Sequence, residues 1–313
     1  MKKYVFSQAV NLALGRFQSH LAAQGLNPNT IRQHSNYTGI YLTWLEEEGL
    51  EEQQAGYREI MAFVRWLQQE YRARFINRVL LAVRHYYRFL EVETNPAAGI
   101  YLKGHTRKLP ETIVDEQELK SLYENFEANT NRDKRNRVML GLMVFQALTT
   151  EELGKLQPGH IRIRQAKIQV PSGKHSNART LDLQAVQLLD MQEYLLEVRP
   201  RMLTEAGKYR SGRKPQHVNT EEIAGQLFFS ENGSKHIKRS IWHLFRKISK
   251  THPKITSGKI IRQSVITHWL KGKDIRRVQY MAGHRYVSST QRYRDYNTEE
   301  LSRALQSFHP LND

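Results

Sequence analysis

The spacing of apolar residues predicts four amphipathic helices in the first ninety residues. Apolar side chains recur every three or four positions between residues 6 and 91, the period of a helix with one buried face. Gly25 is typical of the residue after a helix end, Asn27-Pro28 of a new helix start, and Gly49 of a second end. Arginines recur on the polar faces of these helices, at Arg65, Arg72, Arg74, Arg78, Arg84 and Arg88.

A basic stretch with few helix signals, residues 96–112, follows these helices. We place the domain boundary there, between a helical domain of residues 1–95 and a second domain of residues 113–313 with a C-terminal helix. The helical period resumes in the second domain. It predicts helices over residues 118–126, 135–147, 150–156 and 185–198.

Alternation of apolar and polar residues predicts strands only after residue 160. Apolar residues alternate with charged ones around Ile161 and Ile168, and a turn follows at 171–174. Residues 179–183 are then expected to form a strand that pairs back with the one before the turn. This pattern predicts a small three-stranded antiparallel sheet within a helical domain. The expected fold class is therefore mainly α with a small antiparallel β-sheet, and the polar stretch 205–221 is expected to be a loop.

The charge balance indicates a polyanionic partner. The chain has 48 Lys and Arg against 31 Asp and Glu, a formal net charge of +17, and no cysteine. The absence of cysteine excludes a disulfide framework, a thiolate nucleophile and cysteine-ligated metal sites. Because no apolar run approaches the length of a membrane span, we expect a soluble, cytoplasmic, nucleoid-associated protein. Nucleic acid is favoured over an acidic membrane surface as its partner.

Common catalytic motifs are absent from the sequence. It has no glycine-rich dinucleotide or phosphate loop, and His236, His243 and His252 are too irregularly spaced for a zinc site. We therefore expect no metal and no cofactor. Phosphodiester chemistry without a metal needs a nucleophile, cations around the phosphate oxygens and an acid for the leaving group. The segment 259–296 contains such groups in order.

That segment, KIIRQSVITHWLKGKDIRRVQYMAGHRYVSSTQRYRDY, closely resembles the C-terminal boxes of the tyrosine recombinases, the phage-integrase-like enzymes. The family pattern there is His-x-x-Arg-His, Leu-Gly-His and then Thr-x-x-Tyr. FQALTTEELGKL at 145–156 resembles the family's first box, and the first ninety residues resemble its helical core-binding domain. The resemblance implies a SAM-like DNA-binding domain followed by a mixed α/β catalytic domain.

The resemblance also implies a role for individual residues in a site-specific DNA recombinase. Tyr293 would attack the scissile phosphate and hold the DNA through a 3′-phosphotyrosine bond. Arg262 would grip the nonbridging oxygens, His284 would donate to the phosphate, and Lys174 would protonate the departing 5′-oxygen. Lys259 stands where the family usually has histidine, and a cation there can also stabilise the pentacovalent state.

Besides Lys259, and Gln263 where a second histidine is common, one departure from the family pattern is serious. Thr149 stands where the first box should carry an arginine, and removal of one such donor can cost about 2.7–4 kcal/mol of transition-state stabilisation. Arg179, Lys155 and Arg135 are the candidates for a replacement cation. The alternative is a catalytically impaired DNA-binding or architectural member of the family. A basic helical scaffold for RNA or membrane is a third hypothesis, which the ordered boxes disfavour.

Double-stranded DNA is the expected partner, bound by a homotetramer, and a role for accessory DNA-bending proteins stays open. The amphipathic segment 298–308 is expected to pack either on a neighbouring protomer or on its own domain. Phosphate contacts should supply most of the affinity and make it depend on salt. The expected DNA-binding residues are Arg65, Arg74, Arg78, Lys103, Arg107, Lys108, Arg179, Arg239 and Lys247.

Overall fold

The chain forms two compact units in a computed structural model, Met1–Arg107 and Lys108–Asp313. The structure describes residues 5–103, 112–206 and 220–294. The division between the units falls inside the basic connector 96–112. In the described ranges, no helix is long and apolar enough to cross a membrane. The expected loop at 205–221 and the expected helix at 298–308 lie mostly or wholly outside these ranges.

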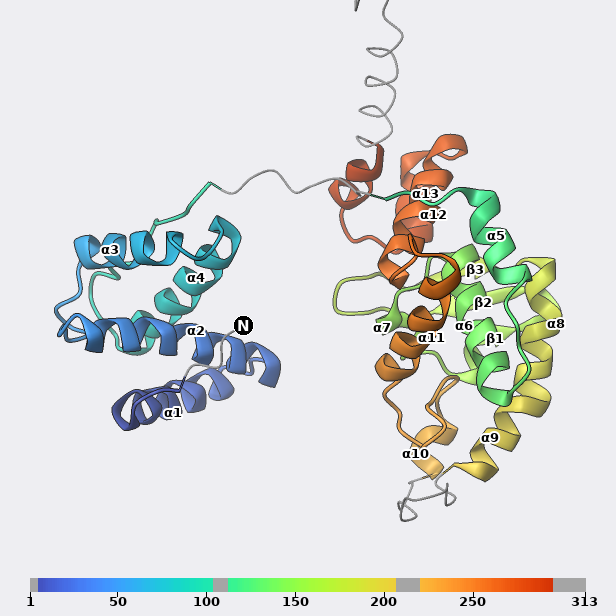
Figure 1. The fold of residues 1–313 in the computed structure, drawn as a ribbon, viewed down its shortest axis with the longest axis horizontal. Helices are drawn as coiled ribbons and strands as arrows, with labels where there is room; N and C mark the ends of the chain where they lie inside the picture. Colours follow the sequence, from blue (N-terminus) through green and yellow to red (C-terminus); the bar gives the residue numbers. More distant parts are fainter. Residues whose placement is uncertain (1–4, 104–111, 207–219, 295–313) are drawn as a thin grey trace, which may run out of the picture. The chain divides into compact units, whose positions relative to one another are not determined.

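The first unit consists of four helices (Figure 1), and the side chains between them form an aromatic-rich core. Gly25 and Gly49 follow the first two helices with positive φ values of 72° and 68°, and the Asn27 side chain accepts from the backbone N–H of Asn29 at 3.0 Å. The predicted helix ends are therefore confirmed. The helices are α1 (Gln8–Ala23), α2 (Pro28–Glu47), α3 (Tyr57–Gln68) and α4 (Ala73–Phe89).

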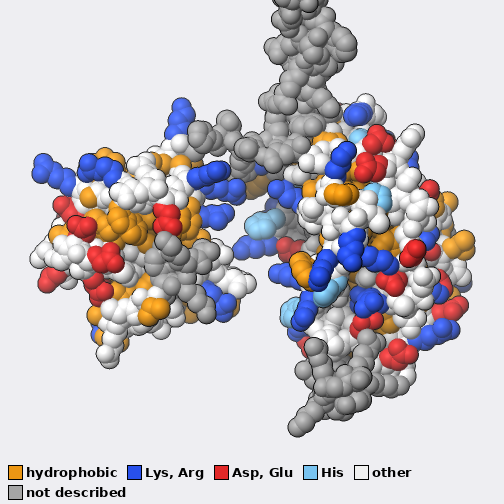
Figure 2. Space-filling view, in the orientation of Figure 1, with side chains coloured by type: hydrophobic (Ala, Val, Ile, Leu, Met, Phe, Trp, Pro, Cys, Tyr) orange, Lys and Arg blue, Asp and Glu red, His pale blue; other side chains and the backbone are white. Residues whose placement is uncertain are grey.

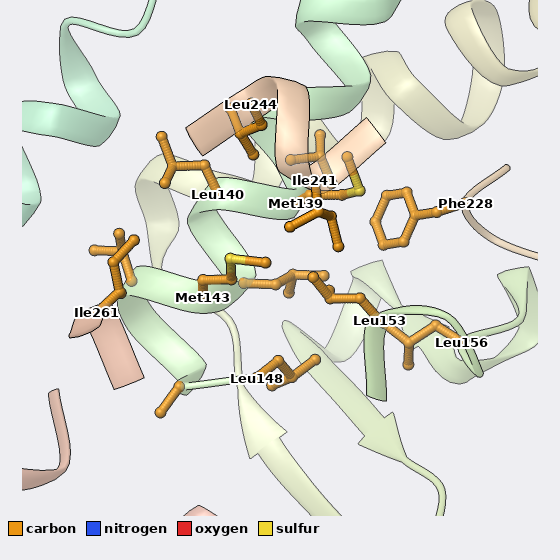
Figure 3. Close-up of a cluster of buried hydrophobic side chains, with 14 of the residues drawn as sticks. Met139, Leu140, Met143, Leu148, Leu153, Leu156, Phe228, Ile241, Leu244 and Ile261 are labelled. Atoms are coloured by element: carbon orange, nitrogen blue, oxygen red, sulfur yellow. The ribbon is translucent and has the colours of Figure 1, made fainter. Parts of the chain in front are cut away.

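The second unit is built around one central helix, α6. Its apolar side chains meet residues from segments far along the chain, including Phe228, Ile241 and Ile261 (Figure 3). The helices α5 (Glu116–Glu124), α8 (Ala185–Glu193) and α12 (Gly258–Gly272) pack against it. The helices of this unit are α5 (Glu116–Glu124), α6 (Asn131–Gln146), α7 (Thr150–Leu153), α8 (Ala185–Glu193), α9 (Arg199–Glu205), α10 (Thr220–Ala224), α11 (Lys238–Thr251), α12 (Gly258–Gly272) and α13 (Ile275–Ala282).

The sheet has the predicted three antiparallel strands in the order β1-β2-β3 (Figure 1). The register places Ile168 opposite both Ile161 and Leu181, so one face of the sheet is apolar. The mainly α fold class with a small antiparallel sheet is thus confirmed. The strands are β1 (Ile161–Arg162), β2 (Lys167–Val170) and β3 (Arg179–Asp182).

Several elements differ from the sequence prediction. The helix predicted over 135–147 starts at Asn131, and the one predicted over 150–156 ends at Leu153. Ile163 lies in a short 3-10 helix instead of a strand, because the chain turns back at Ala166 with a φ of 50°. The helix that starts at Ala185 does not end at Val198 but continues through a π-helical turn into α9. In this turn the buried Tyr194 hydroxyl donates to the carbonyl of Leu227 at 2.7 Å, which satisfies a group that would otherwise be orphaned.

Candidate active site

Arg262 joins the ends of two helices. It lies in the second turn of α12, and its guanidinium donates from Nη1 to the Ala147 carbonyl and from Nη2 to the Ala282 carbonyl, the latter at 2.6 Å. Both carbonyls lie at helix C-termini, of α6 and α13, where the helix dipole favours a positive charge. The guanidinium is therefore held by the backbone of two segments, and its side chain remains 13% exposed.

Thr149 begins α7 and binds Glu152. Its hydroxyl accepts from the Glu152 backbone N–H at 3.1 Å and donates to Glu152 Oε2 at 3.0 Å, while its own N–H donates to the same oxygen at 2.9 Å. This is a capping box, which stabilises a helix start. The residue that replaces the family's arginine thus has a structural function of its own.

Arg179 extends from β3 to the other oxygen of the same carboxylate. Its Nη1 donates to Glu152 Oε1 at 2.6 Å and its Nε to the Met281 carbonyl at 2.8 Å, and its side chain is fully buried. A β-carbon at position 283 would lie 2.4 Å from this Nη1, so the close approach requires Gly283, which also has a φ of 68°. The structure therefore places Arg179 inside the unit and not on a DNA-facing surface.

These groups form a buried cluster with a positive excess, because two guanidiniums flank one carboxylate. Burial alone would raise the pKa of Glu152, but Arg179, the Thr149 N–H and Arg262 outweigh it and hold that pKa below its ordinary value. Burial lowers the pKa of Arg262; Glu152 opposes this shift and Arg179 adds to it. An anion placed beside Arg262 would meet an incompletely neutralised positive field.

His284 and Tyr293 lie beside this cluster. Their rings are parallel within 7° with centroids 6.1 Å apart, and His284 Nδ1 is 2.9 Å from the buried hydroxyl of Thr290. Burial, Arg262 and Arg179 lower the pKa of His284 to about 4, so the imidazole is neutral at neutral pH. Burial raises the pKa of the Tyr293 phenol, while Arg262 and Arg292 oppose that shift. The phenol is consequently protonated at rest.

Lys174 is exposed on a loop that is attached to the His284 segment. Ser176 and His284 form an isolated antiparallel bridge, and the N–H of Asn177 donates to the Gly283 carbonyl at 2.9 Å. Arg285 donates to the carbonyl of Gly173 at 3.1 Å. The loop between β2 and β3 is therefore held next to His284, and Lys174 is free to extend from it.

The remaining candidate cations differ in exposure: Lys259 and Lys155 are exposed, and Arg135 is buried. Lys259 is exposed on α12 one turn before Arg262, on the same helix face. Lys155 is exposed and paired with Glu151 at 3.0 Å. Arg135 is buried and donates to the Phe229 carbonyl at 2.8 Å. It lies near the start of α6, roughly 18 Å of helix from the end that contacts Arg262. The structure does not bring Arg135 to the site.

Most of the predicted DNA-binding residues lie on the surface. Figure 2 shows Lys and Arg side chains gathered where α11 runs, and this helix also exposes 56% of Trp242. Lys247 is exposed but contacts Asp133 at 3.6 Å, and Arg107 and Lys108 lie outside the described residues. The predicted DNA-binding residues that the structure exposes are Arg65, Arg74, Arg78, Lys103, Arg239 and Lys247.

Sequence reasoning missed two residues of this site. Glu152 was not assigned a role, although Thr149-x-x-Glu152 is the spacing of a capping box and marks that carboxylate as fixed. Thr290 is the threonine of the Thr-x-x-Tyr pattern that ends at Tyr293, but this pattern did not indicate its contact with the His284 ring.

The low pKa of His284 predicts a pH-dependent stability. The unfolded imidazole titrates near 6.5, so the unfolded chain binds more protons between about pH 6.5 and 4, and stability falls as pH falls through that window. Between pH 7 and pH 5 the wild-type second unit should lose about 2 kcal/mol more than a His284→Gln variant. Urea unfolding of both proteins at the two pH values measures this difference. Equal losses would contradict the assigned environment of His284.

Comparison with known proteins identifies the family. Residues 112–300 match the phage integrase family, and residues 14–94 match the phage integrase N-terminal SAM-like domain. The first match covers more than half of the chain. The protein therefore belongs to the phage integrase family, that of the tyrosine recombinases, whose activity is site-specific DNA recombination.

Curated relatives and solved structures agree with this assignment. The chain is 27% identical over 299 residues to tyrosine recombinase XerA of Thermococcus onnurineus, covering 95% of each chain. It is 27% identical to XerD of Pseudomonas aeruginosa, covering 92% of this chain and 93% of the relative. The fold resembles XerH bound to its difH substrate, with a TM-score of 0.65, 16% identity and coverage of 96% and 97%. It also resembles the Tn1549 transposon integrase in complex with transposon end DNA, with a TM-score of 0.63, 15% identity and coverage of 93% and 99%.

Proposed function

We propose that this protein cuts and rejoins duplex DNA through a covalent bond to Tyr293. As the phenolic oxygen attacks the scissile phosphorus, the phenol releases its proton to water, the bond from phosphorus to the 5′-oxygen breaks, and a 3′-phosphotyrosine forms. The 5′-oxygen leaves with a proton. Attack by a 5′-hydroxyl from a second DNA end then reverses the step, releases the phenol and joins the new strands. Because one phosphate ester replaces another, no external energy source is needed.

The observation that carries this proposal is the convergence of Tyr293, His284 and Arg262, which lie on separate segments of the second unit. The Tyr293 ring is parallel to that of His284, and the charge of Arg262 acts on both groups. A guanidinium suits a phosphate because its planar fork can donate two parallel hydrogen bonds. The neutral imidazole can donate one more from its N–H, with the Thr290 hydroxyl orienting the ring.

Double-stranded DNA is the proposed substrate. The structurally similar XerH and Tn1549 integrase were both solved with DNA, and the net charge of +17 favours a polyanion. Assembly of four protomers on two DNA sites is part of the proposal, as is a location at the nucleoid. The segment 298–308, expected to pack either on a neighbouring protomer or on its own domain, lies outside the described residues.

A trapped covalent complex tests this function. The substrate is a short duplex, selected from a random pool by binding to the purified protein and then nicked near the cleavage position, so that the cut end diffuses away. The wild-type protein should accumulate a denaturation-resistant protein–DNA adduct and a product with a free 5′-hydroxyl. Tight, selective binding without any adduct on a series of nick positions would refute the proposal.

Lys174 is the proposed acid for the departing 5′-oxygen. Its exposed side chain extends from a loop fixed beside His284, which leaves it able to reach a bound phosphate. Lys174→Ala should lower the rate of cleavage on the order of 100-fold, a typical contribution of general acid catalysis. A substrate with sulfur in place of the bridging 5′-oxygen should restore most of that rate, since a thiolate leaves without protonation.

The matched control for this rescue is Lys155→Ala, a second exposed lysine close to the same loop. It should cleave both substrates like the wild type. If Lys174→Ala is equally slow on the sulfur-containing substrate, the proton donor is another group.

A second candidate function is DNA binding without cleavage. The observation that favours it is Thr149, whose hydroxyl caps α7 and which cannot supply a positive charge. The trapping experiment separates the two functions, because a binding protein would retain the DNA and form no adduct.

A further inference from the structure

Thr149, which occupies the position of the missing arginine, and Arg179 both bind the carboxylate of Glu152. Glu152 Oε2 accepts from the hydroxyl and N–H of Thr149 at 3.0 and 2.9 Å, and its Oε1 accepts from Arg179 Nη1 at 2.6 Å. A longer side chain at position 149 would start within contact of the group that Arg179 already binds. An arginine at position 149 or at position 179 would therefore place a positive charge beside the same carboxylate, that of Glu152.

Arg179 is built into the site more firmly than an ordinary surface arginine. Its Nε is bound to the Met281 carbonyl, Nη1 to Glu152, and Gly283 leaves room for it where any β-carbon would collide. Its Nη2 is buried and has no hydrogen-bond partner in the part of the chain that the structure describes. A buried donor left in this state is costly, which indicates that the guanidinium is retained for something beyond the fold.

We propose that Arg179 supplies, from β3, the positive charge that the family pattern places at position 149. The proposal rests on the function proposed above. Arg262 and Glu152 alone would cancel, and Arg179 restores a net positive charge beside the His284–Tyr293 pair. As the phosphorus becomes pentacovalent its oxygens gain negative charge, and a charge buried at low dielectric acts on them with little screening.

Arg179 is a positioning residue in this scheme, because its side chain is buried and acts through Arg262 and His284, the groups that would touch the DNA. It fixes Glu152 beside Arg262 and holds the carbonyl of Met281, two residues before Gly283 and the His284 ring. The side chains of Arg135 and Lys155, the other candidates, are bound to the Phe229 carbonyl and to the Glu151 carboxylate respectively, and not to the carboxylate of Glu152.

A charge-neutral substrate distinguishes an electrostatic role from a merely structural one. In a methylphosphonate, a methyl group replaces one nonbridging oxygen of the scissile phosphate and removes its negative charge. Arg179→Met should reduce adduct formation on the ordinary nicked duplex on the order of 100-fold, as expected for a lost transition-state donor. On the methylphosphonate duplex, the same variant should form adduct within roughly tenfold of the wild-type rate.

The double variant Thr149→Arg/Arg179→Met moves the charge back to position 149. It should cleave the ordinary nicked duplex at a rate within roughly tenfold of wild type. It also pairs Glu152 with the new arginine, so it remains a test if Arg179→Met alone does not fold. An equal deficit of Arg179→Met on both substrates, or a folded double variant that does not cleave, would overturn the proposal. Failure of the proposed function itself looks different, because the wild-type protein would then form no adduct on either duplex.

Discussion

Phenylalanine at position 293 should abolish covalent attachment to DNA and leave DNA binding within a few-fold of wild type. Tyr293→Phe removes only the phenolic oxygen. The ring keeps its parallel contact with His284 and its packing against the core of the second unit. No other group would then form the ester, so the adduct should fall below detection. A denaturing gel of the trapped complex and an equilibrium binding curve on the same duplex measure the two quantities.

Tyr286→Phe is the matched control, because Tyr286 lies in the same segment and is 72% exposed. It should form adduct at the wild-type rate. Adduct formation by Tyr293→Phe, or its loss in Tyr286→Phe alone, would show that the nucleophile is misassigned.

Arg262→Ala should have the next largest effect on cleavage. The substitution removes the guanidinium that joins the ends of α6 and α13 and that would bind the nonbridging oxygens. We expect the cleavage rate to fall on the order of 100- to 1000-fold, the typical cost of a lost oxyanion donor. Arg262→Lys should recover only part of this loss, since an ammonium keeps the charge but not the planar fork. Single-turnover cleavage of the nicked duplex measures both variants.

Thermal unfolding must accompany these rates, because Arg262→Ala also frees two carbonyls of the backbone. Arg201→Ala, an exposed arginine of α9 paired with Glu197, controls for a general loss of positive charge. It should cleave like the wild type. A folded Arg262→Ala protein with wild-type cleavage would remove Arg262 from the reaction.

Local signals in the sequence were sufficient for the first unit. Gly25, Asn27 and Gly49 mark helix ends through backbone geometry and capping, which depend on neighbouring residues only. The sheet was equally accessible, because alternation over four residues identifies a strand. The extension of the helix past Val198 was not, since the π-helical turn depends on Tyr194 finding the distant carbonyl of Leu227.

The candidate site was only partly predictable. The resemblance to the family predicted Arg262, His284 and Tyr293 as site residues, but it did not show which charges are buried. Arg179 was expected both as a DNA contact and as a substitute cation, although it alternates with Thr180 and shares a sheet face with the buried Leu181. That alternation was a signal for burial. Its pairing with Glu152, 27 residues away, depends on tertiary structure and could not be inferred from the sequence alone.

Thr149 thus need not mark a lost activity. The capping box makes it a stable start for α7, and the carboxylate that it caps is also bound by a guanidinium from β3. Arg179 and Arg262 both lie beside Glu152, and both lower the pKa of His284.

Peptide mapping of the trapped adduct tests the central claim most directly. After digestion of protein and DNA, mass spectrometry should find a nucleotide linked through its 3′-phosphate to Tyr293, and the released strand should carry a 5′-hydroxyl. A nucleotide on any other residue, or a 5′-phosphate on the released strand, would contradict this account.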